Sequence, residues 1–103
     1  MFKLIFFAEA ECKDQVKSEL FSLGLGKIGA YDSCCYETKG VGQFRSLEGA
    51  NPYKGNIGVT ESFEEYKIEM VCPDHLIEEA VSKLKEVHPY EMPAYDVIKL
   101  YDL

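Results

Sequence analysis

The sequence predicts an α+β domain of ferredoxin-like topology, with an antiparallel four-stranded sheet and two helices on one face. The main observation is the order of patterns along the chain, which runs strand, helix, strand, strand, helix, strand. The second is size, because 103 residues with 47% hydrophobic content suit one core. We therefore expect a single domain over residues 1–103.

The first element is a strand over residues 2–8. This stretch is apolar on both alternating faces, with Leu4 and Phe6 on one face and Ile5 and Phe7 on the other. Such a pattern is typical of a central strand that is covered on both sides.

The second element is an amphipathic helix that ends near Gly24 or Gly26. Its apolar positions recur at spacings of four, four and three, at Cys12, Val16, Leu20 and Leu23. The following glycines, at 24, 26 and 29, match the G-x-G-x-x-G pattern of dinucleotide sites. That pattern requires a preceding strand and a following helix, and here the order is reversed, so helix capping and a tight turn explain it better.

The middle of the chain predicts two further strands separated by a long excursion. Residues 31–39 have strand-type composition, whereas residues 40–58 are rich in glycine and asparagine. The acidic stretch 61–65 is interpreted as a solvated loop without coordination geometry for a cation. Residues 66–72 then alternate with period two, which predicts the third strand.

A second helix and a fourth strand complete the pattern. Pro73 suits a first helical turn, and His88-Pro89 ends the helix. Residues 94–101 resume strand character. The apolar stripe of this helix consists of Leu76, Ile77, Ala80, Val81, Leu84 and Val87.

Two helices can cover only one face of such a sheet. The first and last strands nevertheless carry apolar residues on both faces. We therefore expect a homo-oligomer, a dimer or a trimer, in which another copy covers the second face.

The net charge and the cysteines indicate which partners and which cellular compartment to expect. The formal net charge is −7 and the basic residues are scattered, which argues against nucleic acid and against an anionic membrane surface. The apolar N-terminal run is too short to span a membrane, and no signal-peptide cleavage region follows it. A cytoplasmic location is expected, with the four cysteines as reduced thiols.

The most unusual stretch is His88-Pro89-Tyr90-Glu91-Met92-Pro93. Two prolines hold the backbone extended while an imidazole, a phenol and a carboxylate are presented close together. One interpretation is a divalent-metal site formed by His88 and Glu91, with Cys34 as a third donor. The alternative is a helix terminator in which His88 sits favourably at the negative end of the helix and Tyr90 packs. The pair Cys34-Cys35 is better explained by structural thiols, one of them in the core.

No catalytic set can be assembled from the sequence, so the protein is not expected to be an enzyme. His75 and His88 are the only histidines, and none of the six serines lies in a recognisable nucleophile motif.

Four segments together resemble a known family. They are residues 28–34, 40–45, 47–53 and 88–96, and they look like the inserted domain of the Nif-three-like (YqfO-type, Ngg-interacting factor) proteins. The resemblance covers about residues 2–100 and implies a PII-like or CutA-like ferredoxin fold. The 88–91 stretch also resembles CutA proteins, trimers linked to divalent-cation tolerance. In larger family members the metal ligands lie in flanking lobes, which this sequence does not contain, so the resemblance carries over no dinuclear site and no hydrolase activity.

The resulting hypothesis is a non-catalytic, oligomeric binding module that contacts a divalent metal ion, a small ligand or a partner protein. A divalent metal ion is the one cofactor that the sequence suggests. Contacts to a ligand or partner are expected from Arg45, Glu48, Asn51 and Tyr90. The alternative is a PII-like sensor of a small phosphorylated ligand, which the net negative charge disfavours. A metal-assisted hydrolase ranks last.

Overall fold

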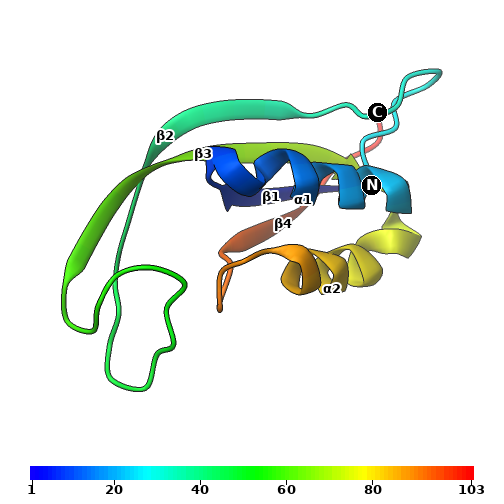
Figure 1. Cartoon of the computed structure of the whole chain (residues 1–103). Helices are drawn as coiled ribbons and strands as arrows, with labels where there is room; N and C mark the ends of the chain where they lie inside the picture. The colour runs from blue at the N-terminus through cyan, green and yellow to red at the C-terminus, as the bar shows by residue number, and fades with distance from the viewer.

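The computed structural model describes all 103 residues, whose strands form one sheet in the order β2-β3-β1-β4 (Figure 1). The strands are β1 (Phe2–Ala8), β2 (Tyr36–Arg45), β3 (Thr60–Cys72) and β4 (Tyr95–Lys99), and all neighbours are antiparallel. The helices are α1 (Ala10–Leu23), the short 3-10 turn η1 (Asp74–Leu76) and α2 (Ile77–Val87). The predicted α+β, ferredoxin-like class is confirmed.

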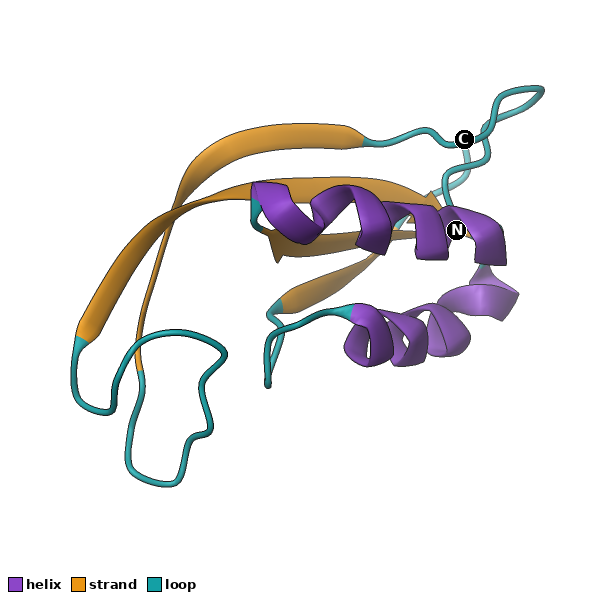
Figure 2. Cartoon of the chain, viewed as in Figure 1, coloured by secondary structure: helices purple, strands orange, loops and turns teal.

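The core lies between the sheet and its two helices, which share one face (Figure 2). Because side chains alternate along a strand, Leu4, Phe6 and Ala8 of β1 all point to this face, as do Ile68 and Met70 opposite them. These side chains are at most 2% exposed. The helices complete the core with Val16, Leu20, Ala80 and Leu84.

Helix α1 ends at Gly24, whose backbone lies in the left-handed region at φ 118°. Its N–H donates to the carbonyls of Leu20 and Phe21, which satisfies the open end of the helix. The interpretation of the first glycine as a cap is therefore confirmed.

Strands β2 and β3 extend beyond the end of β1 and form a two-stranded arm (Figure 1). Strand β1 pairs with β3 only as far as Ala8 opposite Tyr66, whereas the β2–β3 ladder continues to Arg45 opposite Thr60. We call residues 40–45 and 60–65 the arm. It contributes to the longest dimension of the molecule, 46 Å.

Three predicted strand boundaries differ from the structure, two of them in the arm. Residues 31–35 are not strand, residues 40–45 are strand and not part of an excursion, and the acidic stretch 61–65 is strand and not a solvated loop. The reason is visible at Gly42, which lies opposite Phe63. A side chain at position 42 would collide with the Glu65 carboxylate, so the glycine admits a neighbour across the ladder.

No helix covers the opposite side of the sheet (Figure 2). The register places Ile5, Phe7, Val71 and Ile98 on this side, which we call the open face. Ile5 is only 5% exposed and Ile98 is 46% exposed, and charged side chains of the same strands lie between the apolar ones. Neither α1 nor α2 is long and apolar enough to cross a membrane.

Truncation of Leu84 should test the assignment of the core. Leu84 is fully buried, so Leu84→Ala should lower the free energy of unfolding by about 2–5 kcal/mol through lost contacts and a cavity. The same change at Leu47, which is 62% exposed, should cost no more than about 0.5 kcal/mol. Urea unfolding at one fixed protein concentration measures both, and equal losses would contradict the assignment.

Candidate functional site

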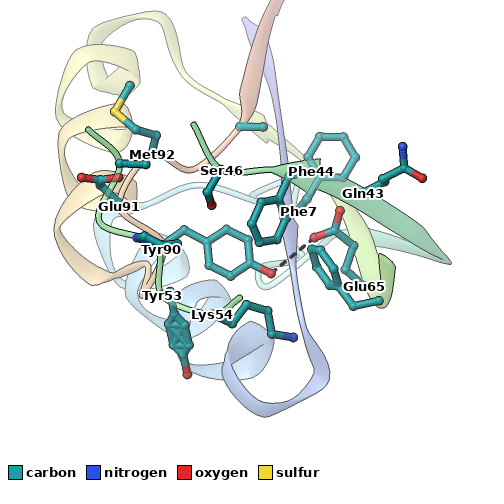
Figure 3. Close-up of a pocket in the computed structure, with 14 residues that line it drawn as sticks. Phe7, Gln43, Phe44, Ser46, Tyr53, Lys54, Glu65, Tyr90, Glu91 and Met92 are labelled. Atoms are coloured by element: carbon teal, nitrogen blue, oxygen red, sulfur yellow. Dashed lines mark hydrogen bonds between the residues drawn. The ribbon is translucent and has the colours of Figure 1, made fainter. Parts of the chain in front are cut away.

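A pocket of about 260 Å³ lies where β1 ends. Three segments surround it: the arm, the loop of residues 46–59, and a corner of residues 88–94 between α2 and β4 (Figure 3). Its aromatic lining is Phe7, Phe44, Tyr53, Phe63 and Tyr90, and its polar lining includes Lys54, Glu65 and Glu91.

Glu9 joins these segments. It follows β1 directly, and its side chain is only 15% exposed. One carboxylate oxygen, Oε1, lies 2.5 Å from the Lys54 ammonium of the loop. The other, Oε2, accepts a hydrogen bond of 3.1 Å from the Tyr90 hydroxyl of the corner. One carboxylate therefore ties both the loop and the corner to the central strand.

Tyr90 is held as a hydrogen-bond donor. Its hydroxyl also lies 3.5 Å from Oε2 of Glu65, so two carboxylates face one phenol (Figure 3). Burial and the Glu9 charge raise the pKa of Tyr90 well above its ordinary value. Burial likewise raises the pKa of Glu65, against the lowering effect of the Tyr90 hydrogen bond. The phenol therefore keeps its proton at physiological pH and donates it to the Glu9 carboxylate.

His88 is buried beneath the corner, with 5% exposure. Its Nε2 lies 2.7 Å from the Phe7 carbonyl oxygen, which only accepts, so Nε2 carries the hydrogen. Nδ1 then accepts the Tyr90 backbone N–H at 3.2 Å. Both nitrogens of a neutral ring are thus engaged, and burial lowers the pKa of His88.

The 46–59 loop is also held through its backbone. The Asn51 N–H donates to the Glu91 carboxylate at 3.0 Å, and the Gly58 N–H donates to the Ser46 carbonyl at 2.7 Å. The first bond links the loop to the corner, and the second closes the loop on itself.

The structure does not gather the predicted metal donors His88, Glu91 and Cys34. Both His88 nitrogens are already bonded, and Glu91 accepts from Asn51. Cys34 donates its backbone N–H to the Gly26 carbonyl, and Gly26 donates to Val71, which pairs with Lys3 near the start of β1. His88 is bonded to Phe7, near the end of that strand. No group of three or more histidine, cysteine, aspartate or glutamate side chains in the chain is arranged to hold a metal ion.

The predicted contact residues divide into two groups. Tyr90 lines the pocket, and Asn51 lies beside it through its bond to Glu91. Arg45 and Glu48 are exposed and do not line it.

Sequence reasoning missed most of the pocket, including Glu9, Lys54 and Glu65 and the rings Phe44, Tyr53 and Phe63. Residues 60–65 carry a single apolar side chain, that of Phe63, so the alternation of partly buried and exposed positions in this stretch is visible only in the folded strand. Nothing in the sequence pairs Lys54 with Glu9, since 45 positions separate them.

The fold places the chain in a known structural class, the CutA-like and PII-like ferredoxin folds. CutA1 from Pyrococcus horikoshii superposes with a TM-score of 0.72 at 20% identity, covering 100% of this chain and 86% of that one. The PII-like protein CutA from Nostoc sp. superposes with a TM-score of 0.69 at 18% identity, covering 97% and 81%. At these identities the likeness concerns the fold.

Closer relatives are longer proteins. The chain is 39% identical over 100 residues to the GTP cyclohydrolase 1 type 2 homolog of Halalkalibacterium halodurans, and 35% identical over 95 residues to that of Bacillus subtilis. These matches cover 97% and 92% of this chain but only 27% and 26% of the relatives. A solved Bacillus cereus protein related to NIF3 superposes with a TM-score of 0.83 at 32% identity, covering 98% of this chain and 26% of that one.

The chain is therefore related to one segment of the Nif3-like proteins, as the sequence resemblance predicted. It spans about a quarter of the length of these curated relatives. No protein-family model matches it.

The buried imidazole of His88 should make stability depend on pH. Because its pKa is lowered in the folded state, the unfolded chain binds the proton more readily, so the free energy of unfolding should fall as pH drops below about 6.5. Urea unfolding between pH 7.5 and 5 should show this loss in the wild type and a flatter profile in His88→Gln, which keeps a donor for Phe7 but cannot titrate. The matched control is His75→Gln at an exposed histidine, which should keep the wild-type profile. A His88→Gln profile as steep as that of the wild type would contradict the assignment.

Proposed function

We propose that the chain is a non-catalytic, oligomeric binding module of the Nif3-like and CutA-like type, which contacts a small ligand or a partner protein through the pocket at the end of β1. The observation that carries this proposal is the construction of the pocket. Three segments that are distant in sequence converge there, and Glu9 joins them through Lys54 and Tyr90.

The chemistry of the pocket, and of the histidine buried beneath its corner, supports binding in preference to catalysis. His88 has no free nitrogen to take a proton, and Tyr90 keeps its proton because its pKa is raised. Neither group is poised to activate a nucleophile. The relatives' name refers to a GTP cyclohydrolase, but this chain matches only 27% of the first of them, so their activity is not transferred to it.

A protein or ligand contact is better supported than a divalent metal. A metal at the 88–91 stretch would have to displace either the Phe7 carbonyl or the Tyr90 N–H from His88. Carboxylates surround the pocket, yet Glu9 is already paired with Lys54. The small-ligand and partner contacts proposed are those of Tyr90 and Asn51, with Arg45 and Glu48 on the adjoining exposed surface.

Assembly through the open face is the second part of the proposal. On this face Phe7 and Val71 are partly exposed and Ile98 is exposed, with no covering helix, and burying them against another copy would remove apolar surface from water. A dimer or a trimer satisfies this requirement.

Sedimentation tests the assembly. The wild-type chain at micromolar concentration should sediment as a species larger than the 11.7 kDa monomer. Ile98→Glu should shift it toward monomer, because an unpaired carboxylate buried between copies loses its hydration. The control is Ile28→Glu, at an exposed position outside the sheet, which should sediment like the wild type. A wild-type chain that is only monomeric contradicts this part of the proposal.

Nucleotides test the alternative of a PII-like sensor. The site contains the carboxylates of Glu9, Glu65 and Glu91 and a single ammonium, that of Lys54, so phosphate groups should be repelled. ATP and ADP at millimolar concentration should leave the melting temperature unchanged within error. A rise that grows with nucleotide concentration supports the sensor instead.

A further inference from the structure

The pocket contains an unbroken row of aromatic rings. Phe44 and Phe63 have centroids 5.7 Å apart, Phe63 and Tyr90 are 6.4 Å apart, and Tyr90 and Tyr53 are 6.0 Å apart. The first two pairs meet edge to face. The face of an aromatic ring carries partial negative charge, so a row of rings around one cavity favours a cation.

The charged groups around the rings favour the same kind of ligand. Glu65 and Glu91 line the pocket, and Glu9 reaches it through Tyr90. The site therefore contains three carboxylates and one ammonium, that of Lys54, which is paired with Glu9. An anion would meet net repulsion here, whereas a cation would meet attraction.

Lys54 itself shows what such a site holds. Its ammonium lies 4.6 Å from the centroid of the Phe63 ring and 2.5 Å from Oε1 of Glu9. The side chain is 37% exposed and belongs to the 46–59 loop, so it reaches the site from a segment that lies outside the sheet (Figure 3). An alkylammonium group thus already sits between a ring face and a carboxylate.

We propose that this pocket is a binding site for the alkylammonium group of a small organic cation, and that Lys54 is its built-in competitor. The proposal deepens the proposed function and rests on it, because it names the ligand class of the same pocket. The row of rings supplies the faces, Glu9 supplies the counter-charge, and a ligand enters as the Lys54 ammonium leaves.

A metal ion or a nucleotide suits this lining less well. Most of its surface is carbon, from five aromatic rings together with Ala50, Pro52, Met92 and Ala94. A small hard cation requires several oxygen ligands in place of its water, whereas an alkylammonium keeps apolar contacts along its carbon chain and needs one or two acceptors.

Chemical rescue tests the site. Lys54→Ala removes the competitor, and n-butylammonium chloride supplies the four carbons and the ammonium of a free lysine side chain. Calorimetry and thermal shift should detect n-butylammonium binding to Lys54→Ala at least about tenfold more tightly than to the wild type, since a tethered group competes at an effective concentration in the millimolar range. The uncharged n-butanol should have no such effect.

Two variants control the result. Lys39→Ala removes an exposed lysine paired with Glu64 outside the pocket, so it should respond to n-butylammonium like the wild type. Glu9→Gln in the Lys54→Ala background should weaken n-butylammonium binding about tenfold or more, because the counter-charge is lost. Equal responses to n-butylammonium and n-butanol, or no response in Lys54→Ala, overturn the proposal.

Two further measurements keep the outcome decisive. If Lys54→Ala does not fold, NMR titration of the wild type decides. n-Butylammonium should shift the ring resonances of Tyr53, Phe63 and Tyr90, and n-butanol should not. Equal shifts with the two compounds overturn the proposal. Sedimentation of the same samples separates a failure of the proposed ligand class from a failure of the proposed assembly. An assembled chain without ammonium binding overturns only the ligand class, and a monomer that binds n-butylammonium overturns only the assembly.

Discussion

A carboxylate that is largely removed from water has to be paired, and the partners that Glu9 takes determine how the pocket is built. Strand β1 is bonded to β3 on one side and to β4 on the other, so Glu9 lies at the end of an inner strand of the sheet. From there Glu9 takes Lys54 from the 46–59 loop and Tyr90 from the 88–94 corner. Without this pairing, the loop would be joined to the corner chiefly through the Asn51–Glu91 bond.

The elements that were predicted well are those whose signal is local. Strand β1, both helices and the second half of β3 follow from hydrophobic periodicity within a few turns or residues. The arm was missed because its cause is tertiary. Gly40 and Gly42 read as loop residues, yet both lie in the ladder, and at position 42 the Glu65 carboxylate fills the space that a side chain would need. Long-range pairing overrides a low intrinsic strand preference at such positions.

The site was predicted only in part, because most of its contacts join segments that are distant in the sequence. The 88–93 stretch stood out in the sequence because two prolines flank polar and aromatic side chains, and the structure does place Tyr90 in the pocket. A metal at His88 stays a prediction, and the metal would have to displace a carbonyl of β1 or an N–H of the corner, which occupy the two ring nitrogens. A sequence pattern shows which side chains are near one another along the chain, but not which backbone groups face them.

The central claim is that Glu9 and Lys54 hold the pocket together, and a double-mutant cycle on stability tests it most directly. The free energy of unfolding would be measured for the wild type, Glu9→Gln, Lys54→Met and the double variant, at one protein concentration and low salt. Direct pairing predicts a coupling energy of about 0.5–3 kcal/mol, as contacting residues show. Additive effects, within about 0.3 kcal/mol, would contradict it.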